Sequence, residues 1–318
     1  MSRPILIDCD PGHDDAIAIL FALGSPQVRL TAITTVAGNQ TLDKTTHNAR
    51  WVCTVAGVSD VPVAAGCDRP LVRPLMVAAD IHGETGLDGP APITPTVPLD
   101  DRHAVDLIIE QVMRRPGELT LVPTGPLTNI AVAMRREPRI VDAVREVVLM
   151  GGAYTRGNRT PAAEFNIAFD PEAAAAVFDA DWQVTMVGLD PTHQARATTE
   201  VIDRIRALRT PVSRFVEAIL TSYGDAYRVT HGLDAPPVHD PCAVAHVVDP
   251  DLITTQDAYV VVETQGRHTA GMTVTDFRGV LGQPLRTKVA THIDADAFWD
   301  RLVEALDRLG ADRCPRDT

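Results

Sequence analysis

Four acidic side chains within eight residues are the feature of this sequence with the clearest chemical meaning. They belong to the segment Asp8-Cys9-Asp10-Pro11-Gly12-His13-Asp14-Asp15. The apolar run before it, residues 4–7, predicts a buried strand, and Pro11-Gly12 predicts a sharp turn into a helix. That turn would bring Asp14 and Asp15 back towards Asp10. Carboxylates this close repel one another unless a cation lies between them.

Oxygen ligands without nearby histidine or cysteine pairs favour a hard cation, and calcium accepts about six to eight of them in a flexible geometry. The spacing differs from that of an EF-hand loop. A simpler explanation is that acidic residues stabilise the start of a helix through its dipole. That explanation covers Asp14 and Asp15 but leaves Asp8 and Asp10 unexplained. The segment therefore predicts a calcium site.

The elements that would position this site alternate between strand and helix patterns. Predicted strands cover residues 4–7, 28–36, 61–65, 119–123, 146–150 and 184–189. Predicted helices cover residues 16–23, 42–55, 104–113 and 127–134. Such alternation predicts an α/β fold, with an open, mostly parallel, Rossmann-like sheet and helices on both faces. In such sheets, ligands bind beyond the carboxyl ends of the strands, which is where the acidic segment lies.

The rest of the chain predicts loops, edge strands and a closing helix. Segments 66–101 and 151–170 are long enough to be functional loops. Residues 258–264 and 271–275 predict strands at an antiparallel edge, and residues 295–309 predict an amphipathic helix. We found neither repeats nor a linker, and we expect one domain over residues 1–318.

Composition narrows the classes of partner. A net charge of −13 repels phosphate backbones and argues against nucleic acid as a partner. No apolar stretch reaches the roughly 18 residues of a membrane span, and Met1–Pro4 contains no signal core. Five cysteines without paired metal spacing fit a reducing compartment. We therefore expect a cytoplasmic protein without a membrane partner.

The acidic segment is similar to the signature of the inosine–uridine preferring nucleoside hydrolase family, and the resemblance continues along the chain. The further matching blocks are Val36-Ala37-Gly38-Asn39, His82-Gly83-Glu84-Thr85-Gly86-Leu87, Pro123-Thr124-Gly125-Pro126-Leu127-Thr128-Asn129, Met150-Gly151-Gly152, Glu164-Phe165-Asn166 and His239-Asp240-Pro241. The resemblance implies the nucleoside hydrolase fold and calcium-dependent hydrolysis of a ribonucleoside to ribose and free base.

The resemblance also implies the ligands of the metal and the contacts to the sugar. Calcium would be held by Asp10, Asp15, Asp240 and the backbone carbonyl of Thr124. By pattern alone, Asp240 could equally be the N-cap of an apolar helix. The predicted ribose contacts are Asp14, Asn39, Met150, Asn158, Glu164 and Asn166. Without the resemblance, segment 151–170 would be interpreted as a surface loop.

The predicted chemistry needs a base and an acid. Asp10 is the candidate base that takes a proton from the attacking water. His239, beside the predicted ligand Asp240, is the first candidate for protonating the leaving base, and His82 in segment 81–89 is the second. His13 occupies a variable position of the signature and is expected only to pack or to contact solvent.

Base preference is left open by the sequence. The resemblance implies that Tyr227 and His231 contact the base, although Tyr227 could equally be a partly buried tyrosine in a helix. Segment 221–228 is expected to form a lid. The overall pattern leans towards pyrimidine nucleosides, with purine or broad specificity and another N-ribosyl compound as alternatives. A further alternative is a calcium-dependent ribose-binding protein without turnover, although the presence of Asp10, Asp14 and His239 argues against it. A homodimer or homotetramer is expected by resemblance.

Overall fold

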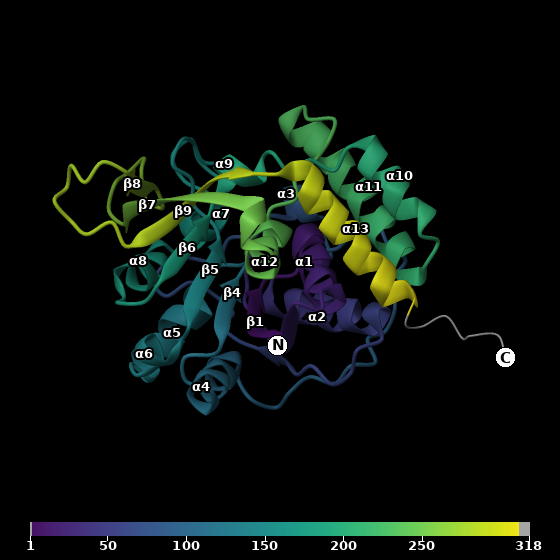
Figure 1. The fold of residues 1–318 in the computed structure, drawn as a ribbon, viewed down its shortest axis with the longest axis horizontal. Coiled ribbons are helices and arrows are strands. Elements are labelled where there is room, and N and C mark those ends of the chain that lie inside the picture. The colour runs from purple at the N-terminus through teal and green to yellow at the C-terminus, as the bar shows by residue number, and fades with distance from the viewer. Residues whose placement is uncertain (1, 312–318) are drawn as a thin grey trace.

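A nine-stranded sheet organises residues 2–311, which the computed structural model describes, and Figure 1 shows helices packed against it. The strand order is β3-β2-β1-β4-β5-β6-β9-β7-β8. The strands are β1 (Arg3–Cys9), β2 (Val28–Thr35), β3 (Val63–Ala65), β4 (Thr120–Pro123), β5 (Glu146–Met150), β6 (Val184–Val187), β7 (Ile253–Val262), β8 (Thr273–Asp276) and β9 (Thr287–Ile293).

Successive apolar side chains along a strand point to opposite faces of the sheet, so the hydrophobic core consists of two clusters, one on each face. Ile5 and Ile7 of β1 join one cluster, whereas Leu6 joins the other, because successive side chains point to opposite faces. The first cluster is covered by α1 (His13–Gly24), α2 (Leu42–Ala56), α10 (Thr199–Ala207), α11 (Pro211–His231), α12 (Asp240–Val248) and α13 (Ala295–Ala311). The second is covered by α4 (Ala104–Arg114), α5 (Thr128–Arg136), α6 (Ile140–Ala143), α7 (Phe165–Phe169) and α8 (Pro171–Asp179).

Three short elements complete the fold: α3 (Ala79–His82), α9 (Leu189–Thr192) and the 3₁₀ turn η1 (Pro250–Leu252). Seven neighbouring strands run parallel, in the sheet order β3-β2-β1-β4-β5-β6-β9. At the edge of the sheet, β7 is antiparallel to both of its neighbours, β9 and β8. The predicted α/β class, with a mostly parallel sheet and an antiparallel edge, is confirmed.

One strand was missed by the sequence patterns. β9 lies between β6 and β7 and joins the parallel part of the sheet to its antiparallel edge. Its polar residues Lys288 and His292 are exposed, while Val289 and Ile293 are buried. The alternation is interrupted by the adjacent buried pair Val289 and Ala290, and the register with β7 shifts directly after Ala290, so the period-of-two signal is weak.

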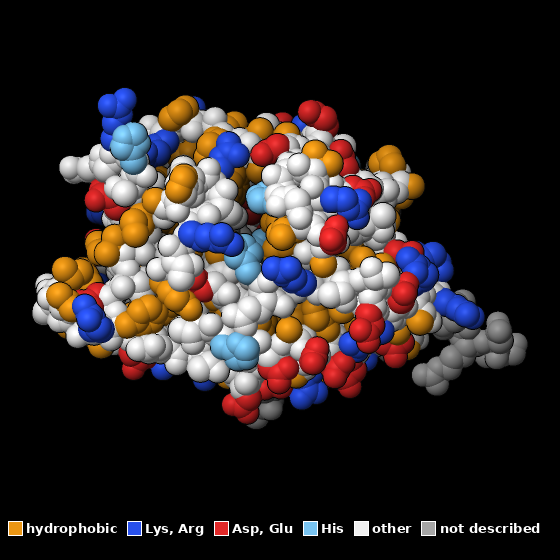
Figure 2. Space-filling model, turned by 90° about the horizontal axis from the view of Figure 1, so that it is seen from above, with side chains coloured by type: hydrophobic (Ala, Val, Ile, Leu, Met, Phe, Trp, Pro, Cys, Tyr) orange, Lys and Arg blue, Asp and Glu red, His pale blue; other side chains and the backbone are white. Residues whose placement is uncertain are grey.

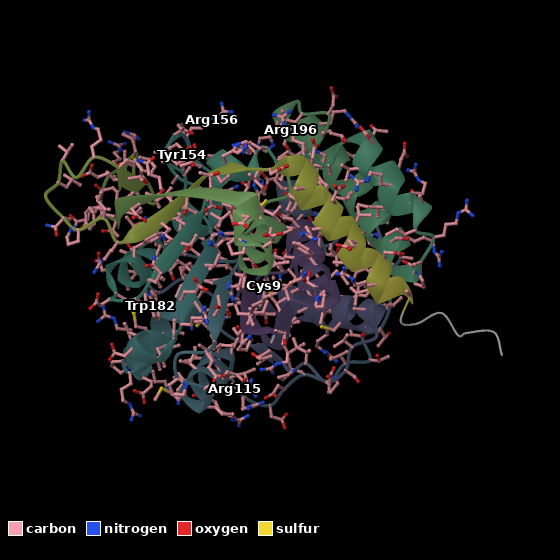
Figure 3. All side chains as sticks on the ribbon, in the orientation of Figure 1. Cys9, Arg115, Tyr154, Arg156, Trp182 and Arg196 are labelled. Carbon is pink, nitrogen blue, oxygen red and sulfur yellow. The ribbon has the colours of Figure 1, made fainter. Side chains whose placement is uncertain are left out.

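The reversal of strand order places a crevice at the end of β1. The chain passes from β1 outwards to β2 and β3, and then returns to β4 on the other side of β1. Such a switch point leaves an opening beyond the carboxyl ends of the two central strands. Cys9, the last residue of β1, is fully buried. Figure 3 labels it in the central part of the molecule.

The helices and the cysteines of the structure can be compared with what the composition predicted. Within residues 2–311, no helix combines the length and the apolar character needed to cross a membrane. The described cysteines Cys9, Cys53, Cys67 and Cys242 are free thiols. Cys314 lies outside the described residues.

Candidate active site

A pocket opens at the switch point and gathers residues from eight separate segments of the chain. It is lined by twelve predicted site residues: Asp14, Asn39, His82, Thr124, Met150, Asn158, Glu164, Asn166, Tyr227, His231, His239 and Asp240. The other two predicted residues, Asp10 and Asp15, are fully buried and contact the lining residue Asn39. Seen from above, histidine and basic side chains flank a hollow in the middle of this face (Figure 2).

The floor of the pocket is a cluster of carboxylates. Asp14, Asp15 and Asp240 each offer an oxygen atom, and these oxygens lie within 4.8 Å of one another. Asp240 is the first residue of α12, whose N-cap position is occupied by His239. The carboxylate of Asp240 therefore does not serve as the N-cap. Asp14, which we predicted to contact ribose, joins the cluster.

Asp10 has one anchored oxygen and one free oxygen. Its Oδ2 accepts a hydrogen bond of 2.6 Å from the main-chain N–H of Asn39. Its Oδ1 is buried without a protein partner, which is costly for an ionised carboxylate unless a cation or a water molecule contacts it. A Cβ at Gly38 would lie 2.0 Å from Oδ2, and one at Gly125 would lie 2.5 Å from Oδ1. Two glycines thus make the room in which Asp10 sits.

Burial and mutual repulsion raise the pKa values of the cluster. Burial is the larger cause for Asp10 and Asp240, whose pKa values lie well above the usual range, and the neighbouring carboxylates add to it. The same two causes raise the pKa of Asp14 to about 7. The donor set is therefore suited to a hard divalent cation, whose charge would offset the repulsion and favour the ionised forms.

One wall of the pocket presents amide, carboxylate and main-chain groups. The side chain of Asn166 donates to the carbonyl oxygens of Thr124, at 2.7 Å, and Met150, at 3.2 Å. Glu164 is the N-cap of α7 and accepts hydrogen bonds from the N–H groups of Asn166, Ile167 and Gly152. Burial raises the pKa of Glu164 to about 7, and these main-chain donors act against that rise.

Asn158 holds the outer part of the same wall. Its Oδ1 accepts a hydrogen bond of 2.9 Å from the N–H of Phe165, and its residue is exposed at the mouth of the pocket. The predicted loop 151–170 thus contains a short helix, α7, whose first turn is fixed by Asn158 and Glu164. These local hydrogen bonds fix the wall, and both Asn158 and Asn166 line the pocket.

The opposite wall carries His239 between two hydroxyl groups. Nδ1 of His239 lies 2.8 Å from Oγ1 of Thr192, and Nε2 lies 3.0 Å from the hydroxyl of Tyr227. Burial, followed by the charges of His193 and His231, lowers the pKa of His239 to about 3. The ring is therefore neutral at pH 7, and any proton it supplies to the pocket has the Tyr227 hydroxyl as its immediate neighbour.

His82 forms a hydrogen bond with the main chain of the acidic segment, residues 8–15. The main-chain N–H of His13 donates to Nδ1 of His82 at 3.2 Å, which places the proton of a neutral His82 on Nε2. Burial, together with His13 and His239, lowers the pKa of His82 well below its usual range. The rings of His13, His82 and Tyr223 stack with centroid separations of 5.1–5.6 Å. His13 is thus packed in the interior.

Two segments differ in form from what the sequence indicated. Residues 221–228, expected as a lid, belong to the continuous helix α11, and Tyr223 and Tyr227 are buried on its inner side. Segment 81–89 begins in the short helix α3, in which His82 is only 6% exposed. His231 ends α11 and stacks on Tyr227 with ring centroids 4.8 Å apart.

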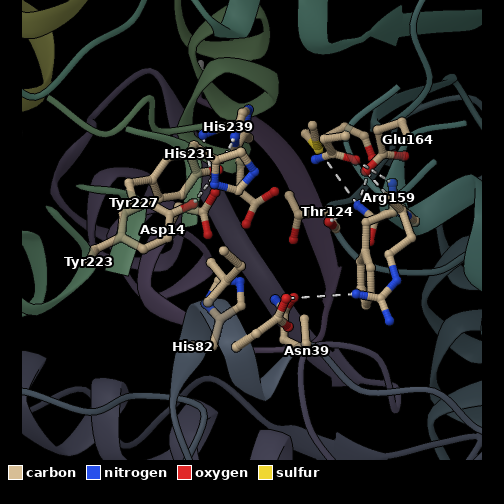
Figure 4. A pocket seen from close by; sticks show the side chains of 18 residues that line it. Asp14, Asn39, His82, Thr124, Arg159, Glu164, Tyr223, Tyr227, His231 and His239 are labelled. Atoms are coloured by element: carbon tan, nitrogen blue, oxygen red, sulfur yellow. Dashed lines mark hydrogen bonds and ion pairs between the residues drawn. The ribbon is translucent and has the colours of Figure 1, made fainter. Parts of the chain in front are cut away.

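Sequence reasoning missed four polar residues of the pocket and its surroundings: Asp80, Arg159, Thr192 and Tyr223. Tyr223 was detectable, because it lies four residues before Tyr227 and thus on the same face of a helix. Thr192 gave no local signal, since its contact with His239 joins α9 to α12. Figure 4 shows the two walls, with Tyr227 and His239 on one side and Glu164 and Arg159 on the other.

An open α/β sheet with an acidic floor and two polar walls at its switch point has the form of a site for a small polar ligand. The family model described as inosine-uridine preferring nucleoside hydrolase matches residues 5–300, so the chain belongs to that family. It is a nucleoside hydrolase, an enzyme that hydrolyses the N-glycosidic bond of ribonucleosides. The resemblance identified from the sequence blocks is confirmed.

Curated relatives and a solved structure are similar to this protein over almost the whole chain. An inosine-uridine preferring nucleoside hydrolase from Crithidia fasciculata is 53% identical over 312 residues, covering 98% of this chain and 99% of the relative. A pyrimidine-specific ribonucleoside hydrolase, RihA, from Shewanella woodyi is 47% identical, covering 96% and 99%. The structure of a purine-preferring ribonucleoside hydrolase from Gardnerella vaginalis is 35% identical, with a TM-score of 0.91 and coverage of 97% and 99%.

Proposed function

We propose that this enzyme hydrolyses ribonucleosides in a calcium-dependent manner, with a preference for pyrimidine nucleosides. The observation that carries the calcium dependence is the unpartnered, fully buried Oδ1 of Asp10 beside a cluster of three further carboxylates. We propose Asp10, Asp15, Asp240 and the carbonyl oxygen of Thr124 as its ligands. When bound, calcium would supply a positive centre that holds the ribose diol and the attacking water.

The polar wall is proposed to bind the sugar. Glu164 and Asn166 are already fixed by hydrogen bonds to the main chain, so they can meet ribose hydroxyls without further ordering. We place Asp14, Asn39, Met150 and Asn158 among the ribose contacts as well. Carboxylate oxygens near the sugar would also stabilise the positive charge that develops on C1′ as the bond to the base breaks.

Proton movement is proposed to involve both walls. Oδ1 of Asp10 accepts a proton from water as the water oxygen bonds to C1′ and the bond from C1′ to the base breaks. The departing nitrogen then takes a proton from the Tyr227 hydroxyl. The Nε2–H of the neutral His239, 3.0 Å away, stabilises the resulting phenolate by a hydrogen bond, and the proton that Asp10 took from water returns to the phenolate through solvent. His82, with its proton on Nε2, is the second candidate donor.

Uridine is the substrate shared by the names of the two kinds of curated relative, inosine-uridine preferring and pyrimidine-specific. We therefore expect uridine and cytidine to be hydrolysed faster than inosine and adenosine. The test is release of ribose from each of the four nucleosides with calcium present and after chelation. Faster turnover of inosine would reject the pyrimidine preference, and full activity after exhaustive chelation would reject the calcium dependence.

A further inference from the structure

The short helix α9 ends at Thr192, whose hydroxyl contacts one nitrogen of the His239 ring. The hydroxyl oxygen lies 2.8 Å from Nδ1 of His239, and both side chains are buried. The hydroxyl also contacts the carbonyl oxygen of Leu189 at 3.4 Å, and this oxygen already accepts the N–H of His193 at 2.9 Å. Because 3.4 Å is long for an O–H···O hydrogen bond, Nδ1 is the better acceptor for the hydroxyl proton.

Donation by Thr192 determines where the proton of the His239 ring lies. In a neutral imidazole one nitrogen carries a proton and the other accepts, so an accepting Nδ1 leaves the proton on Nε2. Nε2 lies 3.0 Å from the hydroxyl oxygen of Tyr227, to which it then donates. The phenolic proton of Tyr227 is therefore free to point into the pocket. With the reverse order, Tyr227 would donate to Nε2 and its proton would point away from the substrate.

The first residues of α9 are bound to the wall that is proposed to hold the sugar. The N–H of Leu189 donates to the carbonyl oxygen of Gly152 at 2.9 Å, and the N–H of Gly152 donates to Glu164 at 3.0 Å. A Cβ at Gly188 would lie 2.6 Å from the same carbonyl oxygen, so glycine permits this close approach. Main-chain hydrogen bonds thus fix the start of α9 against the sugar wall.

Asp190 adds a side-chain contact between α9 and the same wall. Its Oδ2 accepts a hydrogen bond of 2.8 Å from the N–H of Tyr154, and its carbonyl oxygen accepts one of 3.1 Å from the side chain of Gln194. None of these bonds involves the hydroxyl of Thr192. Removal of that hydroxyl should therefore break the contact with His239 without releasing α9.

We propose that Thr192 is a positioning residue for the leaving-group acid. It holds the ring of His239 at a fixed place relative to the sugar wall, with the ring proton on Nε2, so that Tyr227 presents its own proton to the departing base. This inference rests on the proposed function, since it concerns the acid of that reaction. Thr192 is fully buried and does not line the pocket, so it acts only through His239.

The first test removes the hydroxyl and keeps the shape of the side chain. We expect Thr192→Val to lower kcat on uridine by roughly 10-fold, the value of about one buried hydrogen bond, with a smaller change in KM. Hydrolysis of p-nitrophenyl riboside should be nearly unchanged, because its leaving group needs no proton. Thr192→Ser keeps the hydroxyl and should recover most of the activity on uridine. Equal losses on the two substrates would overturn the inference.

Thr185 offers a matched control, because its buried hydroxyl has no hydrogen-bond partner. It lies in β6, the strand that precedes α9. Thr185→Val makes the same chemical change with no hydrogen bond to lose, so we expect unchanged kinetics on both substrates and an equal or higher melting temperature. A loss on uridine as large as that of Thr192→Val would indicate a general effect of packing and would also overturn the inference.

The second test observes the His239 ring without turnover. Nitrogen-15 spectra of histidine side chains distinguish protonated from unprotonated ring nitrogens, and the signals of His239 are those that His239→Ala lacks. In the wild type and in Thr192→Ser, we expect a protonated Nε2 and an unprotonated Nδ1. In Thr192→Val, the Nδ1 signal should shift, because its hydrogen bond is lost. A wild-type ring protonated on Nδ1, or ring signals that Thr192→Val leaves unchanged, would contradict the proposal.

The inference and the proposed function fail in different ways. Absence of ribose release from uridine in the wild type refutes the proposed function. A normal kcat on uridine in Thr192→Val, while the wild type is active, refutes the inference alone. Thermal unfolding of each variant confirms that it is folded before its kinetics and spectra are compared.

Discussion

The hydroxyl of Tyr227 and Nε2 of His239 lie 3.0 Å apart, which joins the long helix α11 to the first residue before α12. His239 is neutral because burial lowers its pKa to about 3. Thr192 contacts the other ring nitrogen, so the imidazole bridges two hydroxyl groups. We propose that these two side chains act together in protonating the leaving base, and each can be tested separately.

Removing the Tyr227 hydroxyl should slow hydrolysis of natural nucleosides. For Tyr227→Phe and His239→Ala, we expect kcat on uridine to fall by roughly 10²-fold or more, the usual contribution of a general acid. Hydrolysis of p-nitrophenyl riboside should fall far less, because its leaving group needs no proton. Tyr223→Phe is the matched control, since its hydroxyl is 3.5 Å from that of Tyr227 and does not contact His239. Equal losses on both substrates would remove the pair from this role.

Asp10→Asn should abolish most turnover and leave the fold intact. The amide oxygen can still accept the N–H of Asn39, while the uncharged side chain can no longer take a proton from water. We expect kcat to fall by roughly 10²- to 10⁴-fold, the range for a general base. The melting temperature of the metal-free variant should equal or exceed that of the wild type, because one repelling charge is removed. Near-normal turnover would contradict the proposed mechanism.

A methyl group at Gly38 should damage the metal site. The added Cβ would lie 2.0 Å from Oδ2 of Asp10, so the carboxylate must move. We expect Gly38→Ala to weaken calcium binding, measured by calorimetry, and to lower activity in parallel. Gly224→Ala is the control, since its Cβ meets nothing closer than 3.6 Å in a helix and should stabilise the protein slightly. Unchanged calcium affinity in Gly38→Ala would contradict this account.

Calcium should raise the melting temperature more at high pH than at low pH. Burial raises the pKa of Asp14 from 3.8 to about 7, so the metal-free folded state keeps a proton that the unfolded state has lost. The metal-free protein therefore loses stability as pH rises from about 4 to about 7. Calcium favours the ionised carboxylates and offsets that loss. The pocket histidines are present in both the metal-free and the calcium-bound protein. Their titration therefore largely cancels when the two melting temperatures are subtracted.

The measurement is the gain in melting temperature between chelated and calcium-saturated protein at pH 5 and at pH 8. A larger gain at pH 5 would contradict the expected linkage. Asp14→Asn offers a comparison, since this variant should show a smaller dependence of the gain on pH.

The sequence alone was sufficient to predict the fold class and to single out the acidic segment, residues 8–15, as part of the site. Local patterns identified β1, α1 and the turn between them, because a strand, a sharp turn and a helix start depend on neighbouring residues. The order of further blocks was specific enough to identify the family, which the comparison then confirmed. Strand β9 was missed because its burial pattern is broken by a register shift that only its partner β7 makes visible.

Tertiary structure decided which side chains meet. The contacts of His239 with Thr192 and Tyr227 join three helices, and the position of Arg159 opposite that wall depends on a loop between β5 and α7. No periodicity encodes such contacts, since they arise from the way that distant elements pack around the switch point. The residue types in the sequence therefore indicate the chemistry, and the packing of the sheet and helices determines the partners through which it can act.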